Sequence, residues 1–184
     1  MSALPVDVDL TDRAGVGAAA DALAATPDRL DVLVNNAAAF VDWTETATNA
    51  DLDAARRVME TNLFGTWRLT QALLPLLRRS PAPRVVNVSS GGGSHGVMSF
   101  GRTARGGMAA SYGISKAALN ALTATLATEL ADTTILVNAV CPGLTATWPG
   151  AESMGARPVA DSAERERRDL RPCPGARPAR MVRP

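Results

Sequence analysis

The chain has 184 residues, of which 46% are hydrophobic and 20% charged, and this suits one globular domain or part of a larger protein. Its formal net charge of +1 gives no electrostatic case for a nucleic-acid or membrane partner, and no apolar run reaches transmembrane length. Because residues 1–10 lack a signal-peptide pattern and the two cysteines and one histidine are not clustered, the composition predicts a cytoplasmic, metal-free protein.

The first part of the chain predicts a short strand, a helix and a buried strand, in that order. Residues 4–10 alternate valine with aspartate, as at the end of a short strand, and a helical pattern follows from Thr11 to about Ala25. Residues 30–34 are apolar except for Asp31, which is typical of a strand buried in a parallel sheet. The small and amide residues at 35–38 suit a crevice where a ligand approaches the backbone, although taken alone they are better explained by a plain turn.

The middle of the chain predicts a long helix and a second buried strand. A capping-box pattern at 48–51 opens the helix, which reaches roughly residue 78. Asn62 lies inside it, where a buried amide needs partners or marks a kink. Residues 84–88 form the next apolar strand. The serines and glycines at 89–93 either offer a hydroxyl to a cleft with little steric obstruction or form an ordinary loop.

Residues 94–147 complete a predicted alternation of strands and helices. Residues 94–110 form a connection that is long for this kind of fold, which indicates a functional loop. An alanine- and leucine-rich helix begins at Ser111, and residues 135–140 predict another parallel-type strand that ends in the loop 141–147. This alternation predicts an α/β fold with a doubly wound parallel sheet. The strand-end residues then share one rim, where such sheets bind ligands.

Tyr112 and Lys116 are the only tyrosine and the only lysine of the chain. Four residues make about one helical turn, so both side chains leave the same face of the predicted helix. An ammonium group beside a phenol favours the phenolate, so the pair predicts a tyrosine whose pKa is lowered toward neutral pH for proton transfer. The alternative is an exposed tyrosine and a solvated lysine that share a helix by accident.

Several motifs together resemble those of the short-chain dehydrogenase/reductase family, over residues 5–147. They occur in family order: LDVLVNNA at 30–37, TNLFGT at 61–66, VVNVSS at 85–90, YGISK at 112–116 and CPG at 141–143. Their wording and the long interval between Ser90 and Tyr112 are most similar to the carbonyl-reductase-like branch. The resemblance implies a Rossmann-like fold and an NAD(P)-dependent oxidoreductase that interconverts a carbonyl and an alcohol by hydride transfer.

The resemblance also implies a role for each of four side chains. Tyr112 is the general acid that protonates the carbonyl oxygen, and Ser90 hydrogen-bonds the developing oxyanion. Lys116 lowers the tyrosine pKa and binds the nicotinamide ribose, and Asn62 holds a water that relays protons to Lys116. A serine hydrolase is disfavoured, because the sequence around Ser90 is not a nucleophile elbow.

The implied cofactor is NAD or NADP, and the carbonyl-reductase-like motifs favour NADPH. Asp9 and Leu10 match positions that flank adenine, and Asn36 matches one that lines the adenosine ribose. The residues implied in cofactor binding are Asp9, Leu10, Asn36, Ala37, Tyr112, Lys116, Pro142, Gly143, Leu144, Thr145 and Thr147. The implied partners are a small-molecule carbonyl or alcohol substrate and a second copy of the chain, because family members commonly dimerise through two long helices.

The chain departs from the family pattern near both ends. The glycine-rich turn that holds the pyrophosphate is not found before Pro5, and the residue that distinguishes NAD from NADP is missing with it. Residues 1–150 are therefore expected to form an incomplete domain whose strand at 30–35 is an exposed edge. Residues 151–184 are expected to be an Arg/Pro-rich disordered tail or the product of a wrong reading frame. The alternative to an enzyme is a catalytically incompetent truncated remnant or an interaction subunit.

Overall fold

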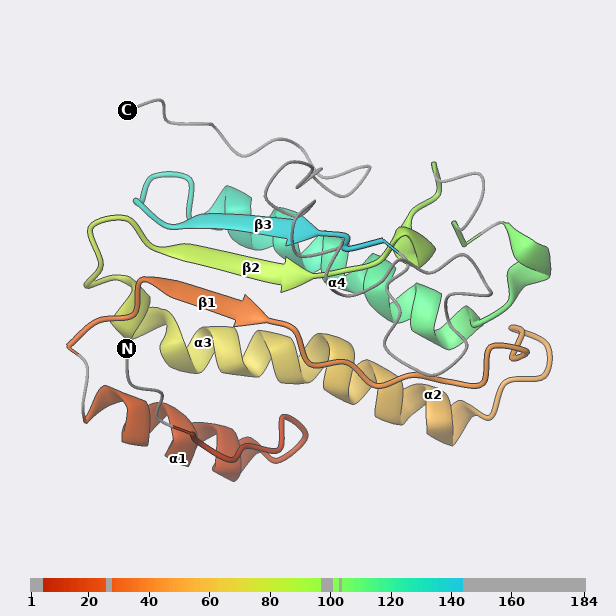
Figure 1. Cartoon of the computed structure of the whole chain (residues 1–184), viewed down its shortest axis with the longest axis horizontal. Helices are drawn as coiled ribbons and strands as arrows, with labels where there is room; N and C mark the ends of the chain where they lie inside the picture. The colour runs from red at the N-terminus through yellow and green to blue at the C-terminus, as the bar shows by residue number, and fades with distance from the viewer. Residues whose placement is uncertain (1–4, 26–27, 97–100, 103, 144–184) are drawn as a thin grey trace.

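The described strands form one parallel sheet. The computed structural model describes residues 5–25, 28–96, 101–102 and 104–143. Within this part of the chain, β1 (Val32–Asn35), β2 (Arg84–Val88) and β3 (Leu136–Val140) lie side by side in that order and point the same way (Figure 1). The predicted α/β fold with a parallel sheet is confirmed. The predicted tail at 151–184 lies outside the described residues.

Helices pack against this sheet and against one another. They are α1 (Arg13–Ala24), α2 (Leu52–Met59), the π-helical turn η1 (Glu60–Gly65), α3 (Thr66–Leu77), the 3-10 turns η2 (Gly91–Gly93) and η3 (Arg105–Gly107), and α4 (Ala110–Glu129). Figure 1 shows α2 and α3 as one nearly continuous coil that runs below the strands. α3 contacts β1, α4 contacts β3, and α1 packs on α3. No helix in the described part of the chain has the length and apolar character needed to cross a membrane.

The helix starts follow from aspartate caps. Asp12 caps α1 by accepting a hydrogen bond from the Ala14 N–H at 2.9 Å. Asp51 caps α2 in the same way, with the Asp53 N–H at 2.9 Å. A side-chain oxygen at this position satisfies one of the backbone donors that a helix leaves unpaired. The helix predicted from the capping-box pattern therefore begins at Leu52, directly after the last residue of that pattern. It is interrupted by η1, where Asn62 lies.

The strand predicted at 4–10 is wrong for the described residues 5–10, which form a coil and the start of a turn. A strand is stabilised by hydrogen bonds to a neighbouring strand, and the backbone here is held by other partners. Asp9 accepts from the N–H and the hydroxyl of Thr11, both at 2.8 Å. The Leu10 carbonyl accepts from the Arg68 guanidinium. The segment therefore packs against η1 and α3 instead of pairing with β1.

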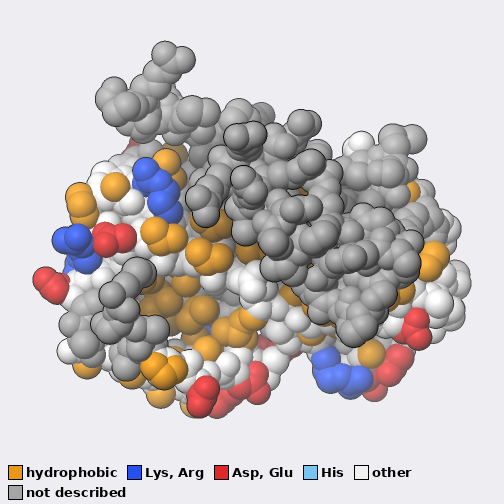
Figure 2. Space-filling model, viewed as in Figure 1, with side chains coloured by type: hydrophobic (Ala, Val, Ile, Leu, Met, Phe, Trp, Pro, Cys, Tyr) orange, Lys and Arg blue, Asp and Glu red, His pale blue; other side chains and the backbone are white. Residues whose placement is uncertain are grey.

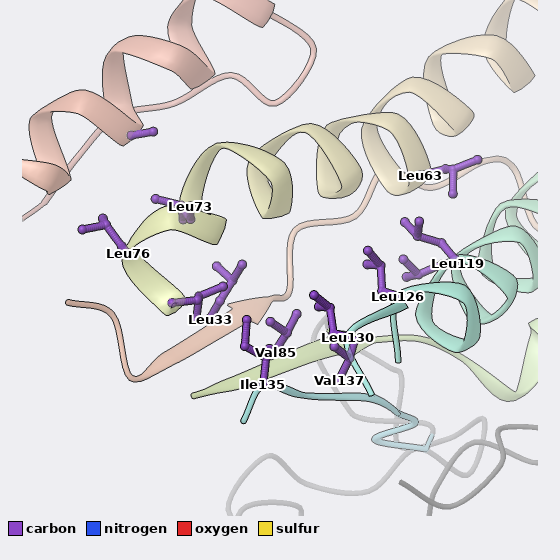
Figure 3. Packing of buried hydrophobic residues seen from close by; sticks show 13 residues of the cluster. Leu33, Leu63, Leu73, Leu76, Val85, Leu119, Leu126, Leu130, Ile135 and Val137 are labelled. Atoms are coloured by element: carbon purple, nitrogen blue, oxygen red, sulfur yellow. The ribbon is translucent and has the colours of Figure 1, made fainter. Parts of the chain in front are cut away.

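The hydrophobic core lies between the sheet and the helices. Figure 3 shows Leu33, Val85 and Val137 of the three strands pointing toward leucines of the helices, among them Leu73 and Leu126. Val85 is fully buried at the centre of the sheet. Alternation along each strand places these side chains on the helix-covered face, because successive residues of a strand point to opposite faces.

A buried row of polar side chains crosses the same face. The Asn35 amide donates to Asn87 at 2.8 Å and to Thr70 at 3.1 Å, and the Asn87 amide donates to Thr123 at 2.9 Å. The threonine hydroxyls in turn donate to carbonyls of their own helices. The row therefore joins α3, β1, β2 and α4 near the carboxyl ends of the strands. Buried polar groups with partners of this kind favour one specific packing of helices on strands.

The opposite face of β1 is open. Val32 is 51% exposed and Val34 is 54% exposed. Figure 2 shows hydrophobic side chains gathered on the left of this view, where Figure 1 shows the strands. Among the described strands, β1 also lies at the edge of the sheet, as the sequence predicted.

Candidate active site

Three of the residues predicted as functional lie together beyond the carboxyl end of β2. Ser90 follows that strand and caps η2, where its hydroxyl accepts from the Gly92 N–H at 3.1 Å. Tyr112 lies in the first turn of α4, and its side chain is hydrogen-bonded to that of Ser90. Lys116 follows one turn later, with its Nζ atom 5.7 Å from the centre of the Tyr112 ring. The structure thus brings a hydroxyl, a phenol and an amine into one group.

Glycines allow η2 to approach α4 closely enough for this contact. A Cβ atom on Gly93 would lie 2.6 Å from the Lys116 carbonyl carbon and 2.7 Å from the Ala117 nitrogen. One on Gly113 would lie 3.0 Å from the Gly92 carbonyl oxygen. Backbone therefore packs directly on backbone at this point. The close approach places Ser90 against the helix that carries Tyr112.

Lys116 is a buried cation. Its side chain is 2% exposed, and Nζ donates to the Val88 carbonyl at 2.8 Å. Burial disfavours the charged form and lowers the pKa of Lys116 from 10.5 to about 8, an effect that nearby Cys141 opposes. The ammonium form therefore still predominates at neutral pH, and the group titrates in the mildly alkaline range.

The direction of the Tyr112 pKa is opposite to the one predicted from the sequence. Burial of the phenol raises its pKa above 10.0, the hydrogen bond from Ser90 works against this rise, and Cys141 adds to it. Removal of the phenol from water is the largest cause of the rise. Lys116 Nζ donates to the Val88 carbonyl and lies 5.7 Å from the centre of the Tyr112 ring.

Two further aromatic rings cover Tyr112. Phe40 stacks on it, with ring centres 5.1 Å apart and planes at 17°, and Trp43 lies tilted at 6.0 Å. Both belong to the connection between β1 and α2. Phe40 is 61% exposed, whereas Tyr112 is 8% exposed. The aromatic pair thus shields the phenol and presents an apolar surface beside it.

Asn62 connects η1 to the β1–α2 connection and to α4 through hydrogen bonds. It is fully buried in η1, where its amide accepts from the Ala39 N–H at 2.7 Å and donates to the Ala39 carbonyl and to Ser115 Oγ, both at 3.0 Å. The Ser115 hydroxyl donates to the Tyr112 carbonyl at 2.7 Å. The side chain is therefore used to join the β1–α2 connection to α4. The water relay to Lys116 that the resemblance implies stays a prediction.

The residues predicted to bind a cofactor are spread along the same edge of the sheet. Asn36 and Ala37 are exposed just after β1, and Pro142 and Gly143 are exposed after β3. Leu10 is half-buried against Gly65, where a Cβ would meet its side chain at 2.7 Å. The hydrogen bonds from Thr11 lower the pKa of the exposed carboxyl of Asp9. The predicted residues Leu144, Thr145 and Thr147 lie outside the described residues.

Sequence reasoning missed several residues that surround Tyr112. Phe40 and Trp43 had a usable signal, because aromatic residues make up only 4% of the chain and these two follow the strand end closely. Glu45, Ser111 and Ser115 had none, because single polar residues in loops and helix starts are common. In the described part of the chain, no group of His, Cys, Asp and Glu side chains could hold a metal ion.

Comparisons with known proteins find relatives over most of the chain. A family model described as short chain dehydrogenase matches residues 1–154. Oxidoreductase UcpA of Salmonella typhimurium is 37% identical over 164 residues, which cover 86% of this chain and 56% of that protein. The rhamnolipids biosynthesis 3-oxoacyl-(acyl-carrier-protein) reductase of Pseudomonas aeruginosa is 37% identical over 142 residues, covering 75% and 52%. The chain thus spans about half the length of the curated relatives it matches.

Solved structures resemble the fold over most of the chain. The NADPH-bound carbonyl reductase from chicken fatty liver has a TM-score of 0.76 at 26% identity, covering 91% of this chain and 69% of that one. The RhlG/NADP active-site complex of Pseudomonas aeruginosa has a TM-score of 0.66 at 35% identity, covering 80% and 59%.

Proposed function

This chain belongs to the short-chain dehydrogenase family, and we propose that it carries the proton-transfer group of an NAD(P)-dependent oxidoreductase that interconverts a carbonyl and an alcohol. The observation that carries the proposal is the buried group in which Tyr112 is hydrogen-bonded to Ser90 and lies one helical turn from Lys116. Relatives named as an oxidoreductase and a 3-oxoacyl reductase support the same reaction class.

Each side chain has a defined part in the proposed reaction. In the reducing direction, the Tyr112 hydroxyl gives its proton to the carbonyl oxygen as the carbonyl carbon gains a hydride. Ser90 donates a hydrogen bond to the same oxygen and stabilises the negative charge that develops there. Lys116 supplies positive charge beside the phenolate that is left, and Tyr112 regains its proton through solvent. Asn62 holds the backbone on both sides of this group in place.

NAD or NADP fits the carboxyl edge of the sheet. Asn36, Ala37, Pro142 and Gly143 are exposed there, and a Cβ on Gly143 would meet nothing within 4 Å. These residues, together with Tyr112 and Lys116, would hold the cofactor. When bound, the nicotinamide supplies or accepts the hydride. We favour NADPH, because the solved structures named above hold NADPH or NADP.

The raised pKa of Tyr112 keeps the phenol protonated at neutral pH. This is the form that the proposed reduction uses when the hydroxyl gives its proton to the carbonyl oxygen. Alcohol oxidation by the same group uses the phenolate as a base, a form that burial disfavours.

Replacing Tyr112 tests the proposal. Tyr112→Phe keeps the ring that stacks on Phe40 and removes only the hydroxyl. We expect NADPH-dependent reduction of a panel of ketones and 3-oxoacyl thioesters to slow by about 10²–10⁴-fold. NADPH should still bind, because the other residues proposed to hold the cofactor are kept, and loss of the hydrogen bond to Ser90 should cost about 0.5–1.5 kcal/mol of unfolding free energy. Thr125→Val is the control, because it removes an exposed hydroxyl from the same helix. Equal turnover by Tyr112→Phe and the unaltered chain would reject the role of the hydroxyl.

A second candidate is an interaction subunit without turnover. Phe64, Trp67 and Ile114 are between 39% and 51% exposed on η1, α3 and α4, which supports association with a second copy through these helices. Titration with NADH and NADPH separates the candidates: absence of binding at millimolar cofactor favours the interaction subunit. A cytoplasmic location stays a prediction from composition.

A further inference from the structure

We propose that Glu45 is a positioning residue that fixes Tyr112 by capping the helix on which it lies. Glu45 lies in the connection between β1 and α2, far from α4 in the sequence. Its carboxylate accepts a hydrogen bond from the Ser111 N–H at 3.0 Å, and both of its oxygens lie 2.9 Å from the Ser111 hydroxyl. Ser111 directly precedes Tyr112, so the contact fixes the turn that carries the phenol.

The start of α4 needs an external partner. The residue at its cap position is Ala109, which supplies no side-chain hydrogen bond and has a left-handed backbone with φ of 52°. This conformation is unfavourable for alanine, and the first turn of a helix leaves backbone N–H groups unpaired. Glu45 therefore provides the capping oxygen that the local sequence lacks. Its position also suits the positive end of the helix dipole.

Burial makes this contact costly to lose. Glu45 is 9% exposed and Ser111 is 6% exposed. The carboxylate accepts hydrogen bonds from both the N–H and the hydroxyl of Ser111. None of the ion pairs among the described residues involves Glu45. The hydrogen bonds from the start of α4 are therefore the main interactions that offset the cost of burying the Glu45 carboxylate. Removing the carboxylate leaves buried donors of Ser111 unpaired.

Glu45 acts at one end of a short clamped segment. At the other end, the Asn62 amide holds the backbone of Ala39 through two hydrogen bonds of 2.7 and 3.0 Å. Between the two clamps lie Phe40 and Trp43, the rings that contact Tyr112. The Glu45 carboxylate therefore helps to fix both α4, which carries Tyr112, and the segment that carries Phe40 and Trp43.

The single tyrosine of the chain makes the proposal measurable. Its ring resonances in an NMR spectrum, from chain with isotope-labelled tyrosine, report the stacking of Phe40 and Trp43. We expect Glu45→Ala to move these resonances toward those of free tyrosine. Absorbance titration of the phenolate should show its midpoint moving to lower pH, because a loosened phenol regains water. The melting temperature should fall by roughly 2–8 °C.

A rescue and a control separate positioning from general damage. Glu45→Gln keeps an acceptor oxygen for the Ser111 N–H, so the tyrosine signals should return most of the way to those of the unaltered chain. Glu129→Gln removes a carboxylate from the exposed far end of α4 and should leave them unchanged. If Glu45→Ala does not fold, Ser111→Ala takes its place, with a smaller shift in the same direction.

Tyrosine signals that are identical in the unaltered chain and in both Glu45→Ala and Ser111→Ala would overturn the proposal. So would an equal shift in Glu129→Gln, or the absence of rescue by Glu45→Gln. The importance of this position for chemistry rests on the proposed function. The positioning role of Glu45 and the proposed function can fail separately, because the tyrosine signals are measured without turnover. If Glu45→Ala shifts the tyrosine signals as expected but the unaltered chain has no reductase activity, only the proposed function is contradicted.

Discussion

The only tyrosine and the only lysine of the chain, Tyr112 and Lys116, lie together and are both buried. The pKa of Lys116 is about 8 because its side chain is removed from water, and the pKa of Tyr112 is raised for the same reason. Burial thus favours the neutral form of each group, which is the amine for Lys116 and the protonated phenol for Tyr112. Lys116 nonetheless keeps its charge at neutral pH, where the proposed reduction needs both an ammonium and a protonated phenol.

The lysine makes a testable contribution to stability. Its pKa is lower in the folded chain than the ordinary value of 10.5, so the unfolded chain binds more protons between about pH 8 and 10.5. The contribution is therefore fully present above pH 10.5 and is lost as the pH falls through about 8. Relative to Lys116→Met, the unaltered chain should gain on the order of 3 kcal/mol of unfolding free energy from pH 7 to 10.5.

Urea unfolding of the two proteins at a series of pH values measures this difference. Lys116 is the only lysine, so the comparison isolates a single group. A difference that stays constant, or falls as the pH rises, would show that Lys116 is not held in a water-poor environment.

At the scale of elements, the contact between η2 and α4 decides whether the site exists. The contact places Ser90 against Tyr112, and it depends on direct packing of backbone on backbone at Gly93. No other residue fits without movement, because the nearest atoms belong to the backbone of a long helix that cannot shift locally.

Replacing Gly93 should therefore cost both stability and the site. Gly93→Ala forces a methyl group to within 2.6 Å of α4, and we expect a loss of about 1–3 kcal/mol of unfolding free energy. Gly17→Ala in α1 is the matched control, because a Cβ there meets nothing within 4 Å. That change should instead add about 0.5–1 kcal/mol, since alanine favours a helix. Thermal unfolding measures the change in unfolding free energy for each variant. Equal changes for Gly93→Ala and Gly17→Ala would refute the close packing at Gly93.

At the scale of the whole molecule, β1 has one face covered by the described helices and the other face half exposed. The described helices cover the face that carries Leu33, while Val32 and Val34 on the other face of β1 are about half exposed. β1 is also an edge among the described strands. Exposed apolar edge strands favour pairing with other chains, so self-association through β1 is expected.

Charge on the open face should reduce this association. Val34→Lys places an ammonium on the exposed face, and we expect smaller particles in light scattering across a concentration series. Its effect on unfolding free energy should stay within about 0.5 kcal/mol. Leu33→Ala, the adjacent residue on the covered face, should cost about 2–5 kcal/mol instead. Unchanged association of Val34→Lys would place the contact elsewhere.

Local patterns determined much of this protein from the sequence alone. The apolar runs predicted the positions of the described strands, because strands of parallel sheets are rich in apolar residues. The spacing of Tyr112 and Lys116 placed both on one face of α4, because helix geometry is local. The family resemblance likewise rests on short motifs that are read directly.

Only the tertiary structure decided how these parts act on one another. The raised pKa of Tyr112 depends on burial of the phenol, and the rings that contact it, Phe40 and Trp43, come from a distant part of the sequence. The cap of α4 comes from Glu45, and the missing strand at 5–10 reflects the hydrogen-bonding partners available in the fold. Solvation and long-range contacts arise when distant segments meet. The sequence therefore predicted which residues gather, and the packing determined their protonation and support.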